Sequence, residues 1–342
     1  MGLRGPDRRN IYRVSMFENN ICIGRAPLRI GYVGGGSDLP GGKGSTFSVA
    51  INKFVYCLAK RRLDKKVYLT WLEKEIVDSA SDLKHDIVRE CLKLKGIDHG
   101  IEILTFSDIP GAGSGLGSSG AVTVSVLCAL NGLLGTPQTQ HEIAKLAASI
   151  EMDILGRSCG PQDPYISTFG GVRHFDYWED RRPSVYRIDL TPHEKTKLEE
   201  SFLLYGPHVP RGDKAFEGRD SDTILSKFSG GEKFRKKCIK LVQDFQSHIR
   251  NHYWLSLGKV VKEHSDLKEK HFPGYESEDL KGIKNIIPHF KLCGAGGTGF
   301  LLVPSNLVRS GAVHDELVKL WGPLLPYKIF NGYAEVVYTS NE

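Results

Sequence analysis

Features that would mark a secreted, membrane-spanning or disulfide-bonded protein are missing from this sequence. Its N-terminus has no apolar signal segment. Its longest apolar run, just after Gly120, is interrupted by Asn131 and Gly132 and is too short to cross a bilayer. The seven cysteines form no C-x-x-C pair, and their odd number favours free thiols in a reducing compartment. We therefore predict a cytoplasmic protein with no membrane partner.

A strong charge imbalance is missing too. The formal net charge is +6 over 342 residues, and basic residues gather only in Lys233–Lys240 (KFRKKCIK), which fits one exposed helix face. This pattern does not support a nucleic-acid partner, and nothing in it indicates an oligomeric state. The length allows two domains. We predict them over 21–190 and 191–342, preceded by a polar, flexible arm over 1–20.

What the sequence has in excess is glycine, with 38 residues concentrated in 31–44, 111–120 and 294–299. The middle cluster, PGAGSGLGSSGAV over 110–122, follows a predicted strand over 101–106 and precedes a predicted helix over 121–134. A glycine-rich turn that opens a helix can bind an anion, because unpaired N–H groups and the helix dipole point at it. The stretch therefore predicts a phosphate-binding loop.

Periodicity and turn-forming residues predict the remaining elements. The segment GRSCGPQDPYISTFGG (156–171) is expected to be a loop, and Thr139 can start the helix before it. Strands are expected over 21–33, 45–60, 67–71, 201–205 and 300–303, and helices over 85–95, 141–155 and much of 220–270.

Two common nucleotide-binding patterns do not fit. The signature G-x-x-x-x-G-K-[ST] is absent, since GGKGS at 41–45 is only a near match. Residues 115–120 match G-x-G-x-x-G, but the acid about twenty residues on, Glu142, falls inside a predicted helix instead of at a strand end. For this stretch alone, a tight turn without a ligand stays an alternative.

Three stretches in order change the interpretation: RAPLRIGYVGGGSDLP (25–40), the middle motif, and CGAGGTG (293–299). Together they resemble the signature motifs of the GHMP small-molecule kinases over roughly residues 21–340. Within that superfamily they look most like the D-glycero-D-manno-heptose 7-phosphate kinases, which phosphorylate the anomeric hydroxyl to make the 1,7-bisphosphate. The resemblance implies an α+β (α/β two-layer) fold, with an N-terminal half like ribosomal protein S5 domain 2 and a ferredoxin-like α/β C-terminal half. It also implies ATP and Mg²⁺ as cofactors and a sugar or sugar phosphate as small-molecule partner.

By this resemblance the middle motif binds the ATP phosphates. Because the loop contains no lysine, a metal must supply much of the positive charge. The Ser119 hydroxyl and the Glu151 carboxylate would hold Mg²⁺, which usually takes one or two carboxylates plus phosphates and waters. The predicted ATP-binding residues are Pro110, Gly111, Ala112, Gly113, Ser114, Gly115, Leu116, Gly117, Ser118 and Ser119.

The spacing of Glu151 and Asp163 resembles that of the galactokinase branch, which makes Asp163 the base or the orienting group for the acceptor hydroxyl. Pro164 follows where many relatives carry Gln, and proline favours extended backbone at Asp163. Arg29 would stabilise the Asp163 carboxylate or the transition-state charge. The plainer alternatives are a surface acid for Glu151, an Asx-turn residue for Asp163 and a structural ion pair for Arg29.

The resemblance also implies a set of sugar-binding residues. Asp38 would bind sugar hydroxyls, since a carboxylate accepts two such bonds at once. The glycines at 34–36 stand where galactokinases have Glu-His, which opens space and argues against galactose. Alternatives are a C1 kinase for fucose, galactose or a uronic acid, and a non-catalytic ATP- or sugar-binding protein of this fold. The predicted substrate-binding residues are Asp38, Gly35, Gly36, Gly294, Gly296 and Gly297, and the unranked candidates for a distal phosphate are Lys43, Arg173, His174 and Arg211.

Overall fold

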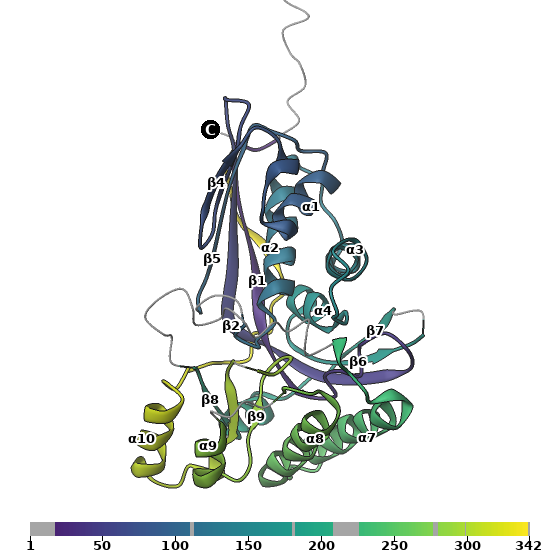
Figure 1. Ribbon diagram of the computed structural model, residues 1–342, viewed down its shortest axis with the longest axis vertical. Helices are drawn as coiled ribbons and strands as arrows, with labels where there is room; N and C mark the ends of the chain where they lie inside the picture. Colours follow the sequence, from purple (N-terminus) through teal and green to yellow (C-terminus); the bar gives the residue numbers. More distant parts are fainter. Residues whose placement is uncertain are drawn as a thin grey trace, which may run out of the picture.

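The structure is a computed structural model that describes residues 18–109, 113–179, 182–207, 226–275, 280–297 and 299–340. The molecule is elongated and has two parts (Figure 1). A large sheet with helices on one face forms the upper part, and a helix-rich part with a small sheet lies below it.

Within the described ranges, the large sheet has eight strands, ordered β11-β1-β2-β5-β3-β4, with β6 and β7 attached through β2. Strand β2 is long enough to pair with β5 through one half and with β6 through the other. The predicted strands over 21–33, 45–60, 67–71 and 101–106 are confirmed. The strands are β1 Ile21–Val33, β2 Gly44–Arg61, β3 Val67–Thr70, β4 Lys74–Val77, β5 Ile101–Ser107, β6 Val172–Tyr177, β7 Pro183–Arg187 and β11 Glu335–Ser340.

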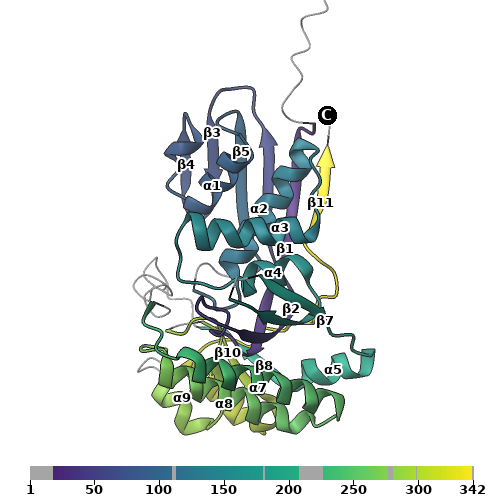
Figure 2. The same ribbon diagram turned by 90° about the vertical axis from the view of Figure 1, so that its right-hand side faces the viewer.

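Helices cover one face of this sheet, as both views show (Figures 1 and 2). The central one is apolar on nearly all sides and therefore buried. The next begins at a capping box between Thr139 and Glu142, so the predicted start is confirmed. The helices are α1 Asp86–Leu94, α2 Ser118–Leu134, α3 Gln140–Ser149 and α4 Gln162–Phe169, with a π-helical turn over Ile150–Ile154.

The lower part contains a three-stranded antiparallel sheet in the order β8-β10-β9. An aromatic cluster joins it to the upper part, with Tyr32 of β1 lying 5.1 Å from Phe202 and 5.2 Å from Phe245 between ring centres. The last strand, β11, returns to pair with β1; the domain boundary near residue 190 stays a prediction. The lower elements are α5 Pro192–Glu200, β8 Phe202–Tyr205, α7 Gly231–Arg250, α8 Leu257–His271, α9 Leu280–Ile286, β9 Lys291–Leu292, β10 Leu301–Pro304 and α10 Gly311–Leu320.

Three predictions about local structure need correction. The segment 156–171 is not all loop, because 162–169 forms α4; Pro164 lies in its first turn, where a missing N–H breaks no helical hydrogen bond. The helix expected over 141–155 is α-helical only to Ser149 and continues as a π-helical turn. The long helical region is two helices, α7 and α8, separated at 251–256; its portion before 226 lies outside the described residues.

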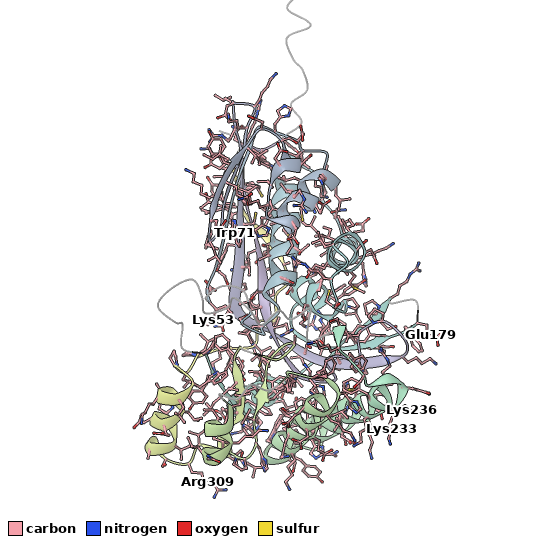
Figure 3. The ribbon with its side chains drawn as sticks, in the orientation of Figure 1. Lys53, Trp71, Glu179, Lys233, Lys236 and Arg309 are labelled. Atoms are coloured by element: carbon pink, nitrogen blue, oxygen red, sulfur yellow. The ribbon has the colours of Figure 1, made fainter. Side chains whose placement is uncertain are left out.

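Other sequence predictions concern the surface and the thiols. Lys233 and Lys236 of α7 point away from the molecule (Figure 3), which confirms the exposed face, although Arg235 between them is buried. None of the seven cysteines, all of which lie in the described residues, forms a disulfide.

Across the described ranges, no helix has both the length and the apolar character needed to cross a membrane. The cytoplasmic location itself stays a prediction.

Candidate active site

The predicted phosphate loop leads into the N-terminus of α2. Pro110, Gly111 and Ala112 lie outside the described residues. Gly113, Gly115 and Gly117 have φ values of 82°, 74° and 77°, a region that strongly favours glycine. Gly117 is the N-cap and carries no side chain that could cap the helix, so the first-turn N–H groups of α2 have no side-chain cap there. This end of α2 has the geometry of an anion site.

Hydroxyl groups line the same turn. The Ser114 and Ser118 Oγ atoms lie 2.8 Å apart. The Leu116 N–H donates to Ser114 Oγ at 3.2 Å, and the Arg29 N–H donates to the Leu116 carbonyl at 2.9 Å. The loop is therefore fixed by its own serines and by β1.

Ser119 and Glu151, the predicted metal ligands, are in direct contact. The exposed Ser119 hydroxyl donates to the buried Glu151 carboxylate, and Thr123 Oγ1 donates to the other carboxylate oxygen at 3.2 Å. Burial raises the pKa of Glu151 to about 7, against the opposing effects of Ser119 and of Arg157, whose Nη1 lies 3.9 Å away. The neighbouring donors and Arg157 therefore do not fully compensate the negative charge of the buried Glu151 carboxylate.

This donor set fits Mg²⁺ bound together with a nucleotide. Among the described residues, no cluster of three or more His, Cys, Asp or Glu side chains could hold a metal alone. A single carboxylate and a hydroxyl, completed by phosphate oxygens and waters, is an arrangement that Mg²⁺ commonly accepts. A cation there would also compensate the buried Glu151 charge.

Arg29 and Asp163 form a two-bonded ion pair across 134 residues of sequence. Arg29 Nε and Nη2 each donate to the Asp163 carboxylate at 2.8 Å, and Nη1 donates to the Gly115 carbonyl. The Arg29 side chain is 7% exposed and that of Asp163 31%. Burial alone would lower the pKa of Arg29, but the charge and hydrogen bonds of Asp163 outweigh it and raise that pKa. The pair therefore orients a partly exposed carboxylate beside the phosphate loop.

The backbone of α4 places Asp163 differently from the prediction based on Pro164. Asp163 lies in the first turn of a helix, so its backbone is helical instead of extended. Helix α2 approaches this turn closely at Gly120, where an added Cβ would lie 2.8 Å from the Asp163 carbonyl carbon and from the Pro164 nitrogen. The N-termini of α2 and α4 therefore meet at Asp163.

This close approach gives a prediction about stability. Gly120→Ala should lower the free energy of unfolding by about 1–3 kcal/mol, because the new methyl group meets backbone that cannot move independently. Gly311→Ala in α10 is the matched control, since a Cβ there meets no atom within 4 Å and alanine is the better helix former. Thermal and denaturant unfolding of both variants measure this. Equal stability of the two variants would contradict the packing seen at Gly120.

Asp38 lies close to this pair in the loop after β1. The Gly36 N–H donates to Asp38 Oδ1 at 2.9 Å, and a Cβ on Gly160 would lie 2.2 Å from Asp38 Oδ2. Burial, and then the charge of Asp163, raises the pKa of Asp38. The two carboxylates therefore share one region, and Gly35 lies beside it with no atom nearer than 3.7 Å to an added Cβ.

The third glycine loop packs on the first turn of the phosphate loop. An added Cβ on Gly294 would lie 2.5 Å from the Gly115 Cα, so only backbone fits between them. Gly296 is as tightly packed against Tyr275, to whose carbonyl the Gly297 N–H donates at 2.8 Å. Gly294 therefore meets the predicted ATP loop, whereas Gly296 and Gly297 contact Tyr275 in the segment after α8.

Basic side chains of the lower part hold the first and third glycine motifs, and the sequence analysis assigned none of them this role. Arg235 donates to the Ser37, Leu39 and Pro40 carbonyls at 2.7–2.8 Å. For the two basic residues of α8 the signal is helical periodicity, since Leu257, Val261, His264 and Lys268 repeat at steps of three and four residues on one buried face. The basic residues are Arg235, His264, Lys268 and Lys291.

The candidates for a distal sugar phosphate are mostly engaged elsewhere. Arg173 donates to the Gly170 and Phe169 carbonyls at 2.8 and 3.0 Å. His174 Nε2 contacts Asp176 Oδ1 at 2.9 Å and Ser45 Oγ at 2.8 Å. Lys43 is exposed above the Trp178 ring, and Arg211 lies outside the described residues. None of these contacts of Lys43, Arg173 and His174 is to Asp38.

Comparison with known proteins agrees with this architecture. Residues 84–171 match the GHMP kinases N terminal domain. The D-glycero-alpha-D-manno-heptose 7-phosphate kinase of Campylobacter jejuni is 30% identical over 212 residues, covering 56% of this chain and 61% of that protein. This chain therefore matches about three fifths of that relative's length.

Solved structures extend the likeness in fold to nearly the whole chain. A D-glycero-D-manno-heptose 1-phosphate kinase from B. thetaiotaomicron superposes with a TM-score of 0.73 at 22% identity, covering 93% of this chain and 99% of that one. A protein solved with MVAPP, AMPPCP and magnesium gives a TM-score of 0.63 at 14% identity, covering 93% and 100%.

The chain thus carries a GHMP kinase N-terminal domain, and its architecture is the α+β GHMP kinase fold. The resemblance inferred from the three glycine-rich motifs is confirmed.

Proposed function

We propose that this chain is an ATP- and Mg²⁺-dependent sugar kinase that phosphorylates an anomeric C1 hydroxyl. The favoured acceptor is D-glycero-D-manno-heptose 7-phosphate, which would give the 1,7-bisphosphate. The C1 oxygen forms a bond to the γ-phosphorus, and the bond from that phosphorus to the β–γ bridging oxygen breaks, releasing ADP. The hydroxyl proton passes to the Asp163 carboxylate.

The observation that carries this proposal is the position of Asp163. Its carboxylate is partly exposed, is oriented by two hydrogen bonds from Arg29, and lies where the N-termini of α2 and α4 meet. Phosphoryl transfer depends on positioning the nucleophile and on stabilising charge on the transferred group. Asp163 and the second carboxylate, Asp38, would position the acceptor hydroxyl. The phosphate loop beside Asp163 would stabilise the charge on the transferred group.

Backbone N–H groups of 113–119 and the first turn of α2 would bind the nucleotide phosphates. Ser119 and Glu151 would hold Mg²⁺, which when bound neutralises part of the phosphate charge. One fold neighbour is described with AMPPCP and magnesium, which supports this pair of cofactors.

Two observations support heptose 7-phosphate as the acceptor. The Campylobacter jejuni relative is named for that substrate, whereas the neighbour from B. thetaiotaomicron is named a heptose 1-phosphate kinase. Of the glycines at 34–36, which stand where galactokinases have Glu-His, Gly35 alone has room for a side chain. A Cβ on Gly34 would lie 2.0 Å from the Ser45 carbonyl oxygen, and one on Gly36 would lie 2.6 Å from the Phe272 ring. The room beside Gly35 favours an acceptor larger than galactose.

The test is ADP release with Mg-ATP across a panel of acceptors: heptose 7-phosphate, mannose, fucose, galactose, glucuronate and mevalonate. We expect turnover with heptose 7-phosphate alone and a product phosphorylated at C1. Turnover with an unphosphorylated sugar would keep the kinase and refute the heptose phosphate. ATP binding without turnover on any acceptor would refute the kinase and favour a non-catalytic binding protein.

A further inference from the structure

Two lysines are buried between the upper and lower parts, next to the candidate active site. Lys268 of α8 and Lys291 of β9 are each 3% exposed. A buried ammonium group needs hydrogen-bond acceptors, and both lysines find backbone carbonyls. Lys291 donates to the Gly31 and Tyr32 carbonyls of β1, and Lys268 donates to the Gly294 carbonyl at 2.5 Å.

A continuous series of contacts connects Lys268 to Asp163. Gly294, whose carbonyl accepts from Lys268, is packed backbone to backbone on Gly115. The Gly115 carbonyl accepts from Arg29, whose other two donors hold Asp163. A shift of Gly294 therefore moves the group that orients the Arg29 guanidinium.

The Lys268 ammonium is itself held in place. It lies 4.6 Å from the ring centre of Tyr275 and 5.3 Å from that of Phe272, distances typical of cation–π contacts. Tyr275 also accepts the Gly297 N–H through its carbonyl. Lys268 and Tyr275 thus support the third glycine loop from the same side.

We infer that Lys268 is a positioning residue for phosphoryl transfer, holding the third glycine loop on Gly115 so that Arg29 and Asp163 keep their alignment. The inference rests on the proposed kinase function. It assigns Lys268 no contact with the reacting atoms.

The protonation of Lys268 gives this role a pH signature. Burial lowers its pKa to about 8, with Asp38 opposing the shift and Arg29 adding to it. Activity should therefore fall as pH rises through about 8, where the charged donor is lost. The charged and titratable groups that face Lys268 are Arg29 of β1, Asp38, Cys238 of α7, His264 of α8, Lys291 of β9 and Cys293.

Stability should respond to pH in the opposite direction. The pKa of Lys268 in the folded protein lies below the ordinary lysine value of about 10.4, so folding releases a proton between about pH 8 and 10. This group's contribution to the free energy of unfolding therefore grows as pH rises through that window. An alkaline loss of activity without a loss of stability cannot be unfolding.

The experiment compares Lys268→Met with Lys262→Met across pH 6.5–9.5. Lys262 lies on the same helix but is partly exposed and paired with Asp266. We expect Lys268→Met to lower kcat at least about tenfold, through misalignment, and to lose the alkaline limb near pH 8. Lys262→Met should keep both. Lys268→Arg, which retains a cationic donor, should recover part of kcat. Wild-type kcat in Lys268→Met, or a loss of kcat that keeps the alkaline limb, would overturn the inference.

A second readout does not depend on turnover. Backbone amide exchange over 113–120 and 293–297 should be faster in Lys268→Met and in Lys268→Gln than in Lys262→Met. Unchanged exchange would overturn the inference. No sugar-dependent turnover in the wild-type protein would instead refute the proposed function, while the exchange result still decides the role of Lys268.

Discussion

Asp163→Asn is expected to lower kcat about 10²–10⁴-fold, the range typical of losing a general base, while Mg-ATP still binds. Asparagine keeps the shape of the side chain and can still accept a hydrogen bond from Arg29 Nε or Nη2. It cannot take the proton of the acceptor hydroxyl. Steady-state kinetics with the accepted sugar, together with calorimetric ATP binding, measure both effects.

The same substitution should cost some stability. Arg29 is buried and would lose its charged partner, and hydrogen bonds to charged groups contribute about 1.5–3 kcal/mol in typical proteins. Asp189→Asn is the control, because Asp189 pairs with Arg187 at 2.6 Å on the exposed surface and should affect neither property. If kcat of Asp163→Asn stayed near the wild-type value, Asp163 would be a structural ion-pair residue only.

Local sequence patterns were sufficient for most of the elements that frame the site. The apolar run after the middle motif predicted α2, and alternating residues predicted β5. The strands β1 and β2 were predicted on either side of a glycine-rich turn. Helix α4 was missed because Gly160, Pro161, Pro164 and Gly170 resemble turn residues. A short helix tolerates proline in its first turn and glycine at its ends, so composition alone could not distinguish the two.

The site itself depended on the family resemblance instead of local pattern. Arg29 and Asp163 are 134 residues apart, and nothing in either segment alone indicates that they pair. The structure brings them together, and it does the same for Ser119 and Glu151. Their roles stay proposals. The family resemblance did not point to Lys268 or Lys291. A lysine is stable inside a protein only where backbone carbonyls supply its acceptors, and here those carbonyls lie in distant segments of the chain.

Glu151→Gln should raise the Mg²⁺ concentration needed for half-maximal activity at least about tenfold, since a neutral amide is a much poorer ligand for Mg²⁺ than a carboxylate. The glutamine oxygen can accept from one of the two hydroxyls, Ser119 or Thr123, and its NH2 group can donate to the oxygen of the other, so the local structure should be kept. Activity measured as a function of free Mg²⁺ at saturating ATP gives this value directly.

Glu151→Gln should not lower stability at alkaline pH, although it weakens the use of Mg²⁺. The Glu151 pKa is raised by burial to about 7, above the ordinary glutamate value near 4.3, so the folded protein binds more protons than the unfolded chain between these values. The contribution of Glu151 to stability is therefore complete below about pH 4.3 and is lost as pH rises through about 7. Without metal, Glu151→Gln should lack this pH dependence and should be at least as stable as the wild-type protein at pH 8.

A buried carboxylate with a structural role would behave differently, which makes Glu199→Gln a useful control. Glu199 accepts from the Ile329 N–H at 2.8 Å and from Lys328 Nζ at 2.9 Å, so its replacement should lower stability and leave the Mg²⁺ requirement unchanged. If Glu151→Gln lost stability as Glu199→Gln does, with the same Mg²⁺ requirement as the wild-type protein, Glu151 would be a structural acid. A variant that needs more Mg²⁺ yet unfolds no more easily would mean that the buried charge is kept at a cost in stability, because the metal requires it.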